Sequence, residues 1–160
     1  MNIFPILFGV RDPIIGNGFV AEVVANGRCL MREESDGAFW VDGVNPGAVC
    51  AGGATKDEAL LRFREVYRDV LVEAASRAES FEEFRSELER FFWEVTPGDP
   101  EEWHEAAERL RKDNGLCGDW LPLQRDWGEP SLKVLRREDD LEPDVNAAEH
   151  LELAANRRAA

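Results

Sequence analysis

The first third of the chain alternates short runs of β-branched, aliphatic and aromatic residues with residues that favour turns. Runs of this length, separated by Gly, Asn, Asp or Pro, are typical of strands joined by tight turns. Asn-Gly is the strongest of these signals, because a type I′ hairpin turn needs positive φ at both central residues. The expected strands cover residues 19–25, 28–34, 38–44 and 48–51, with turns at Asn26-Gly27, Asp36-Gly37 and 45–47. This pattern predicts a meander of three or four antiparallel strands.

Residues 1–17 precede this meander and contain Pro5, Pro13 and Gly16. Proline has no N–H to give to a strand ladder, so within sheets it is confined mainly to edge strands. We therefore expect an edge strand followed by a loop in this segment.

A helix is predicted directly after the meander. Thr55 and Glu58 have the spacing of a capping box, in which each side chain satisfies a backbone donor at the start of a helix. Apolar residues then recur at helical spacing and form one stripe suited to covering a sheet: Ala59, Leu60, Phe63, Tyr67, Val70, Leu71 and Ala74. The predicted unit is therefore a ββββα domain over residues 1–78.

The remaining residues, 79–160, read as an acidic helical extension. A second capping box, Ser80 with Glu83, precedes an aromatic stripe, and Pro100 marks the first turn of another helix. A returning strand is expected at 131–137 and an alanine-rich last helix at 144–158. The fold class is therefore α+β, with an antiparallel meander packed by one amphipathic helix and an extension that packs on it or on a partner.

The chain is strongly acidic. It carries 33 acids and 19 bases, a net charge of −14, and residues 97–160 hold 16 of the acids against 9 bases. Such a field opposes contact with nucleic-acid phosphates, so direct nucleic-acid binding is not expected. An acidic surface suits a basic partner instead, where it raises the association rate more than the affinity.

The cysteines and histidines suggest no cofactor. Cys29, Cys50 and Cys117 are widely separated and odd in number, which fits a reducing cytoplasm better than a disulfide framework. The two histidines, His104 and His150, leave no ligand spacing typical of a metal site. No apolar run approaches the length of a membrane span, and we expect a cytoplasmic protein without metal or cofactor.

Three motifs follow one another within residues 26–71: the run Asp36-Gly37-Ala38-Phe39-Trp40-Val41, the turn Pro46-Gly47 and the helix start GATKDEAL at 53–60. Together they resemble the HicB-like antitoxin family. The resemblance implies a small sheet with one or two helices, a truncated ribonuclease H fold that has lost catalytic function. It also implies that the chain binds and masks a small, basic, mRNA-cleaving toxin.

The carboxy-terminal part departs from that family. Many members add a helix-turn-helix or ribbon-helix-helix module for autorepression, and residues 97–160 show neither pattern. Their net charge of −7 is also unsuited to operator phosphates. The resemblance therefore implies the masking role without the repressor role.

Tryptophans and acids are the contact candidates for such a partner. Tryptophan is enriched at binding hot spots, although packing in a core explains clustered aromatics equally well. The candidate partner-binding residues are Trp40, Trp103, Trp120, Trp127, Asp139 and Asp140.

Two other function classes remain open from the sequence. A small enzyme would place its site around Cys117 and Asp119, in the irregular segment between the predicted helices and the returning strand. A self-assembling scaffold would pair with further copies through an exposed strand edge, giving a homo-oligomer.

Overall fold

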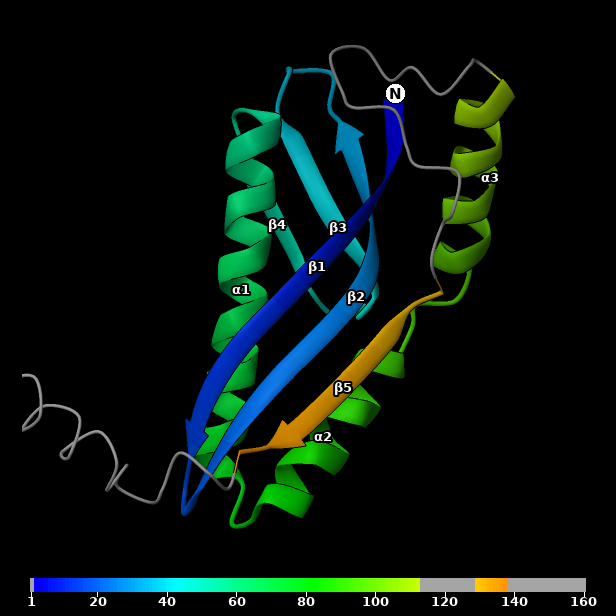
Figure 1. The fold of residues 1–160 in the computed structure, drawn as a ribbon. Coiled ribbons are helices and arrows are strands. Elements are labelled where there is room, and N and C mark those ends of the chain that lie inside the picture. The colour runs from blue at the N-terminus through cyan, green and yellow to red at the C-terminus, as the bar shows by residue number, and fades with distance from the viewer. Residues whose placement is uncertain (1, 113–128, 138–160) are drawn as a thin grey trace, which may run out of the picture.

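The computed structural model describes residues 2–112 and 129–137 of the 160-residue chain. Its elements follow the order β1 (Asn2–Gly16), β2 (Phe19–Glu33), β3 (Phe39–Asn45), β4 (Cys50–Gly53), α1 (Lys56–Arg77), α2 (Phe81–Trp93), α3 (Asp99–Lys112) and β5 (Ser131–Arg136). The strands form one antiparallel sheet with the order β1-β2-β3-β4, and β5 pairs with β2 (Figure 1). The predicted α+β class and the meander are confirmed.

The predicted hairpin at Asn26-Gly27 is wrong. Residues 19–33 form a single strand, and the turn that starts the meander lies at Asn17-Gly18, where Gly18 has a φ of +75°. Gly27 instead permits close packing inside the strand, since an added Cβ would lie 2.4 Å from the Phe8 ring and 2.3 Å from the Asn45 carbonyl oxygen. A glycine within a strand pattern commonly marks such a close approach.

The loop expected after an edge strand in residues 1–17 is also wrong, because β1 runs through that segment without a break. Every residue of β1 pairs with β2, from Asn2 opposite Glu33 to Gly16 opposite Phe19. On its other side, β2 pairs with two strands in succession. Residues Ala21–Asn26 pair with β5, and residues Arg28–Glu33 pair with β3. The neighbour changes at Gly27, and the pairing of β2 with β3 then shifts register between Arg28 and Cys29, so β2 is the central strand.

The helix starts follow the predicted caps. Thr55 Oγ1 accepts from Glu58 N at 3.1 Å, and the Glu58 carboxylate accepts from Ala54 N at 2.8 Å. Ser80 and Glu83 repeat the arrangement at α2. These reciprocal bonds satisfy donors that a helix leaves unpaired, which explains why both helices begin where the sequence predicted.

One face of the sheet, here the first face, packs against α1 and α2. Its core joins strand residues such as Phe8 and Phe19 to Phe63 and Tyr67 of α1 and Phe84 of α2. The Phe8 and Phe63 rings meet edge to face with their centroids 5.2 Å apart, and the ring centroids of Phe19 and Phe84 are 5.3 Å apart. Residues of both predicted regions, 1–78 and 79–160, therefore share one core.

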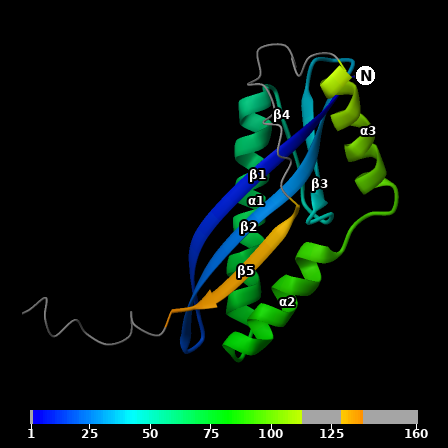
Figure 2. The same ribbon diagram turned by 45° about the vertical axis from the view of Figure 1, so that its right-hand side comes forward.

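The opposite side, here the second face, is covered only in part. α3 packs on the half formed by the ends of β1, β2 and β3, where Leu30, Val44, Trp103, Ala106 and Ala107 make a separate small core. The other half, formed by β1, β2 and β5, carries no described helix, and in Figure 1 its strands lie in front of α1 and α2. Figure 2 shows α3 standing apart from α1 and α2 across the sheet.

Several sequence predictions fall on residues outside the described ranges. These are the helix at 144–158 and the residues Cys117, Asp119, Trp120, Trp127, Asp139 and Asp140. The predicted strand at 131–137 is confirmed as β5.

Candidate partner-binding surface

Trp40 lies on the second face, on β3 and opposite Arg32 of β2. Its side chain is 44% exposed, and its ring rests over Gly52 of the adjacent strand β4. An added Cβ at Gly52 would approach that ring to 3.1 Å, so the glycine provides the flat surface on which the indole lies. The sheet therefore presents one broad apolar ring to solvent at this position.

Arg32 lies directly across from Trp40 on β2 and holds two carboxylates. Its two terminal nitrogens donate to the two oxygens of Glu102 at 2.8 and 2.7 Å, and its Nε donates to Asp42 at 3.2 Å. A two-pronged pair of this kind fixes both partners in direction as well as in distance. The pair joins the first turn of α3 to the sheet across a separation of 70 residues in the sequence.

We call Arg32, Asp42, Asp99 and Glu102 the Arg32 cluster. The hydrogen bonds from Arg32 hold the pKa of Glu102 below its usual range, and the same bonds raise the pKa of Arg32. Burial, together with the charges of Glu102 and Asp42, raises the pKa of Asp99. One cation is thus set among three carboxyl groups, and the cluster is negative overall near neutral pH.

The acidic character continues along the first turns of α3. Asp99, Glu101 and Glu102 lie in its first turn, where negative charge is favoured by the helix dipole. Its last turn is basic, with Arg109, Arg111 and Lys112. The negative charge of α3 is therefore gathered in the turn from which Glu102 reaches Arg32.

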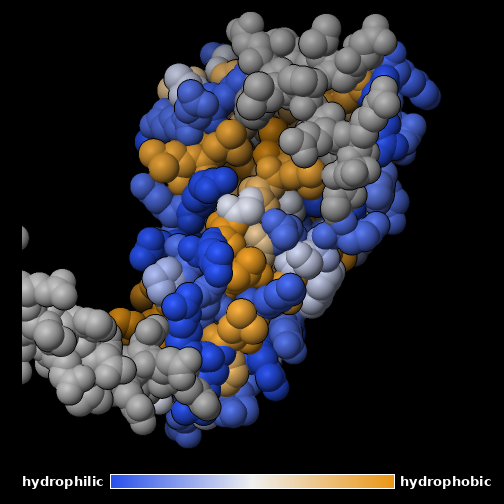
Figure 3. Space-filling view, in the orientation of Figure 1, coloured by the Kyte–Doolittle hydropathy of each residue, from blue (hydrophilic) through white to orange (hydrophobic). Residues whose placement is uncertain are grey.

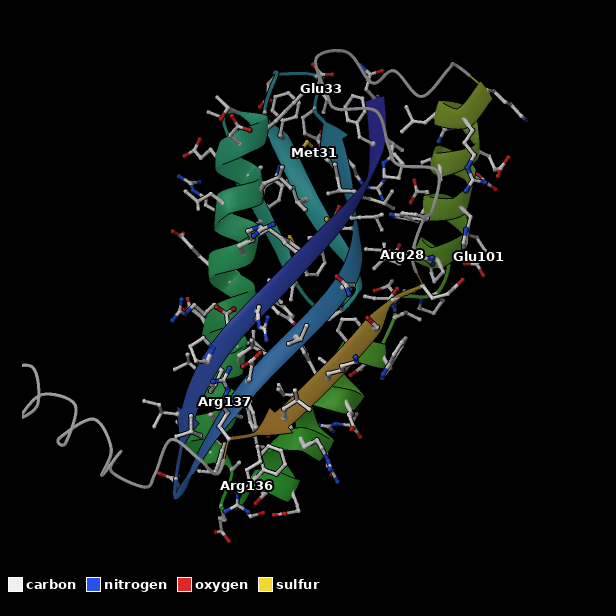
Figure 4. All side chains as sticks on the ribbon, in the orientation of Figure 1. Arg28, Met31, Glu33, Glu101, Arg136 and Arg137 are labelled. Carbon is white, nitrogen blue, oxygen red and sulfur yellow. The ribbon has the colours of Figure 1, made fainter. Side chains whose placement is uncertain are left out.

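The predicted contact residue Trp103 is placed differently from Trp40. Only 1% of it is exposed, its indole N–H donates to the Ile6 carbonyl at 3.3 Å, and the Arg28 guanidinium lies 4.5 Å from its ring. Figure 4 shows Arg28 on the side of the sheet that faces α3. Trp103 is therefore a packing residue between α3 and the sheet, and it offers no surface to a partner in this conformation.

The thiols of the described residues are not activated. Cys29 is fully buried, and burial raises its pKa. Cys50 is exposed beside Asp42, yet partial burial and that carboxylate raise its pKa as well. Because the thiolate is the nucleophile, both groups are in the unreactive form near neutral pH.

No metal site is apparent within residues 2–112 and 129–137, where no group of three or more His, Cys, Asp or Glu is arranged to hold an ion. In the same part of the chain, no helix has the length and apolar character needed to cross a membrane.

The sequence indicated Trp40 but not the Arg32 cluster. Arg32, Asp42 and Glu102 come from three separate elements, and nothing in their local spacing shows that they meet. The signal that was available is the gathering of acids in the first turn of the helix that begins at Asp99.

Comparison with known proteins gives no relative: no family model, no curated protein and no solved structure matches this chain.

Proposed function

We propose that this chain is a non-catalytic binding protein of the HicB-like antitoxin type, which masks a small, basic, mRNA-cleaving toxin. The observation that carries the proposal is the exposed Trp40 ring set beside the negative Arg32 cluster. The meander followed by an amphipathic helix is compatible with the sheet-and-helix unit expected from the resemblance.

The chemistry of this surface favours an arginine or lysine side chain from a partner. A cation over the face of a tryptophan ring is attracted by the ring, and a carboxylate within reach fixes its direction. Trp40 and Asp42 are two residues apart on β3, so their side chains project from the same face. Glu102 adds a second carboxylate from α3.

The overall charge supports the same class of partner. A net charge of −14 attracts a basic protein over several ångströms and repels other acidic ones. Association should therefore slow as salt is added, because the charges that steer the encounter are screened.

The test is binding to the product of a short, basic reading frame adjacent to the gene. Co-expression should rescue growth from that product, and the two proteins should co-purify. Trp40→Ala should weaken the complex by about 30-fold or more, because truncating a hot-spot aromatic commonly costs at least about 2 kcal/mol. Affinity is measured by calorimetric titration of the purified full-length chain.

Trp93→Ala is the matched control. Trp93 is 51% exposed at the end of α2, away from the Arg32 cluster, so its removal should leave affinity within about threefold. Equal losses for both variants, a harmless neighbouring product, or a failure to co-purify would each contradict the proposal.

Self-assembly through a strand edge is the second candidate, and it is favoured by the position of β1. This strand is outermost in the sheet order and pairs with β2 alone among the described elements. The small-enzyme alternative depends on Cys117 and Asp119, which lie outside the described residues. Its test is the loss of a detectable activity in Cys117→Ala.

A further inference from the structure

The outer edge of β1 has a defined set of backbone groups. Arg137 N donates to the Val20 carbonyl at 2.8 Å, so Val20 directs its backbone toward β5 and away from β1. Ile15 is the partner of Val20 on β1. Because hydrogen-bonded and non-bonded pairs alternate in an antiparallel ladder, the odd-numbered residues of β1 direct their N–H and C=O groups outward.

The two prolines of β1 agree with this assignment. Pro5 and Pro13 are both odd-numbered, and a proline fits where no N–H is needed for the ladder to β2. Between them, Leu7, Gly9 and Arg11 have both an outward donor and an outward acceptor. Leu7 is 38% exposed, Gly9 is exposed, and the Arg11 side chain is 74% exposed.

This short stretch is symmetric about its centre. Pro5 and Pro13 each stand four residues from Gly9. Two copies placed antiparallel about a two-fold axis at Gly9 would pair Gly9 with Gly9 and Leu7 with Arg11. The ladder would end where Pro5 of one copy meets Pro13 of the other, with neither residue able to donate.

We propose that two copies of this chain form a dimer by pairing their β1 edges in this register. Each of the three pairs between the prolines exchanges two N–H···O=C bonds, so no donor in the stretch is left without an acceptor. A foreign strand would not require the symmetric spacing of the prolines. The second copy is therefore the occupant that this edge fits best.

The charges near the axis are compatible with such a dimer. The segment from Leu7 to Arg11 contains no acid. Arg11 is held by Glu22 at 2.5 Å, which directs its charge toward β2 and away from the edge. Asp12 lies on the first face, 3.7 Å from Arg68 of α1. The acidic Arg32 cluster lies on the half of the second face that α3 covers, so it does not face its copy across this edge.

The open half of the second face would become continuous across the two copies. Its exposed apolar side chains include Leu7, Ile15 and Leu135, and Figure 3 shows apolar surface on this side broken up by hydrophilic residues. A ladder of this length buries less area than a standard protein interface, so we expect an affinity in the micromolar range rather than a permanent dimer. This inference does not depend on the toxin partner.

The test is sedimentation equilibrium of the full-length chain up to about 500 µM, a range that covers weak interfaces. Gly9→Pro removes the central outward donor in both copies while sparing the ladder to β2. Space is available for it, since the nearest heavy atom to an added Cβ at Gly9 is the Asn26 side-chain oxygen at 3.4 Å. Loss of two bonds should weaken dimerisation at least about tenfold.

Ile15→Pro is the matched control. Ile15 has the same outward parity and is 80% exposed, but it lies beyond Pro13 and outside the ladder. The wild-type chain and Ile15→Pro should dimerise equally, and circular dichroism melts should show that both proline variants remain folded. A wild-type monomer throughout the range, or a Gly9→Pro variant that dimerises like wild type, would overturn the proposal.

Amide hydrogen exchange gives a second readout that needs no variant. Protection of the Leu7, Gly9 and Arg11 amides should rise with protein concentration, because these are the donors that the second copy covers. Concentration-dependent protection elsewhere, with unchanged exchange at these three amides, would place the interface on another surface and overturn the register.

Discussion

Each half of the second face holds one charged side chain between two side chains of opposite charge, and the signs are reversed between the two halves. On the half covered by α3, one guanidinium, that of Arg32, lies between the carboxylates of Glu102 and Asp42. On the open half, one carboxylate, that of Glu22, lies between the guanidiniums of Arg11 and Arg137. The covered half is therefore locally negative and the open half locally positive, within a single sheet face.

The central groups of the two halves also differ in burial. Glu22 is 4% exposed although no described helix covers it, and it pairs with Arg11 of β1 on one side and with Arg137, directly after β5, on the other. Arg136 and Arg137, adjacent in sequence, lie on opposite faces, and Arg136 turns toward Phe81 of α2 (Figure 4). Long cationic side chains can cover a sheet with their methylene groups while their charged ends stay in water. The open half therefore remains paired without a helix above it.

Our two proposals assign separate roles to the two halves. The covered half places negative charge beside an exposed tryptophan and suits a basic partner. On the open half Glu22 is paired with two arginines, and this half borders the β1 edge, where we propose that copies meet. A substitution that removes a contact on one half and leaves the other half unchanged therefore tests this comparison.

Trp103→Ala should produce the largest change. Removing this buried indole leaves a cavity between α3 and the sheet and deletes the bond to the Ile6 carbonyl. The expected loss in free energy of unfolding is about 3–5 kcal/mol, measured by urea denaturation. Trp93→Ala, which truncates a half-exposed ring, should cost about 1 kcal/mol or less.

Comparable losses for Trp103→Ala and Trp93→Ala would mean that α3 is not held on the sheet by this contact. The covered half would then resemble the open half, and the comparison would fail.

The sequence predicted the elements better than their pairing. The capping boxes at Thr55 and Ser80 act over three residues, so local spacing was enough to place both helix starts. Asn26-Gly27 carried an equally strong local signal, but its turn was overridden by the long pairing of β1 with β2. Phe8 packs over Gly27, and that contact joins residues 19 positions apart, beyond the reach of a turn rule.

The candidate site was less predictable for the same reason. Trp40 was indicated by residue type alone, whereas the contact between Glu102 and Arg32 depends on where α3 packs on the sheet. Which face α3 would cover was not visible in its sequence, since its apolar positions Trp103, Ala106 and Ala107 would pack equally well on either face. The Glu22 arrangement joins β1, β2 and the end of β5, and sequence spacing gives no sign of it.

Arg32→Met should give the next largest effect. Within residues 2–112 and 129–137 it removes the only cation in direct contact with both Glu102 and Asp42, while it keeps much of the side-chain volume. Two partly buried carboxylates would then face each other without compensation, at an expected cost of about 1–3 kcal/mol in unfolding free energy. Arg62→Met, which breaks an exposed pair with Glu58 within one helix, should cost about 0.5 kcal/mol or less.

If Arg32→Met were as mild as Arg62→Met, the link between α3 and the sheet would be negligible. Binding of a basic partner would then have to be explained without a fixed position for Glu102.

Glu22→Gln should lower the free energy of unfolding by less than Arg32→Met does. The amide oxygen still accepts a hydrogen bond, and the two arginines it leaves behind are 74% and 47% exposed and can be hydrated. The expected loss is about 0.5–1.5 kcal/mol in unfolding free energy by urea denaturation. A loss above that of Arg32→Met would show that the open half, not the covered one, depends more on its ion pairs.

The dependence of stability on pH should give the smallest effect, and it tests the Arg32 cluster alone. Glu102 has a lowered pKa in the folded chain, so its contribution is present above its unfolded pKa of about 4.3 and is lost as the pH falls through the folded value. Asp99 has a raised pKa, so the folded state binds its proton more readily, and this group adds stability as the pH falls through its raised pKa to its unfolded pKa.

The Glu102→Gln variant separates these two opposing contributions. It should lose stability relative to wild type at neutral pH, and the difference should shrink as the pH falls through the lowered pKa of Glu102, where the wild-type carboxyl becomes protonated as well. Urea midpoints of both proteins, measured between about pH 3 and 7, give this difference directly. Glu82→Gln on the exposed side of α2 should show no such convergence.

A gap between Glu102→Gln and wild type that stayed constant across the range would mean that Arg32 does not hold a carboxylate at this position. The negative charge beside Trp40 would then lack the anchoring that sets the two halves of the face apart.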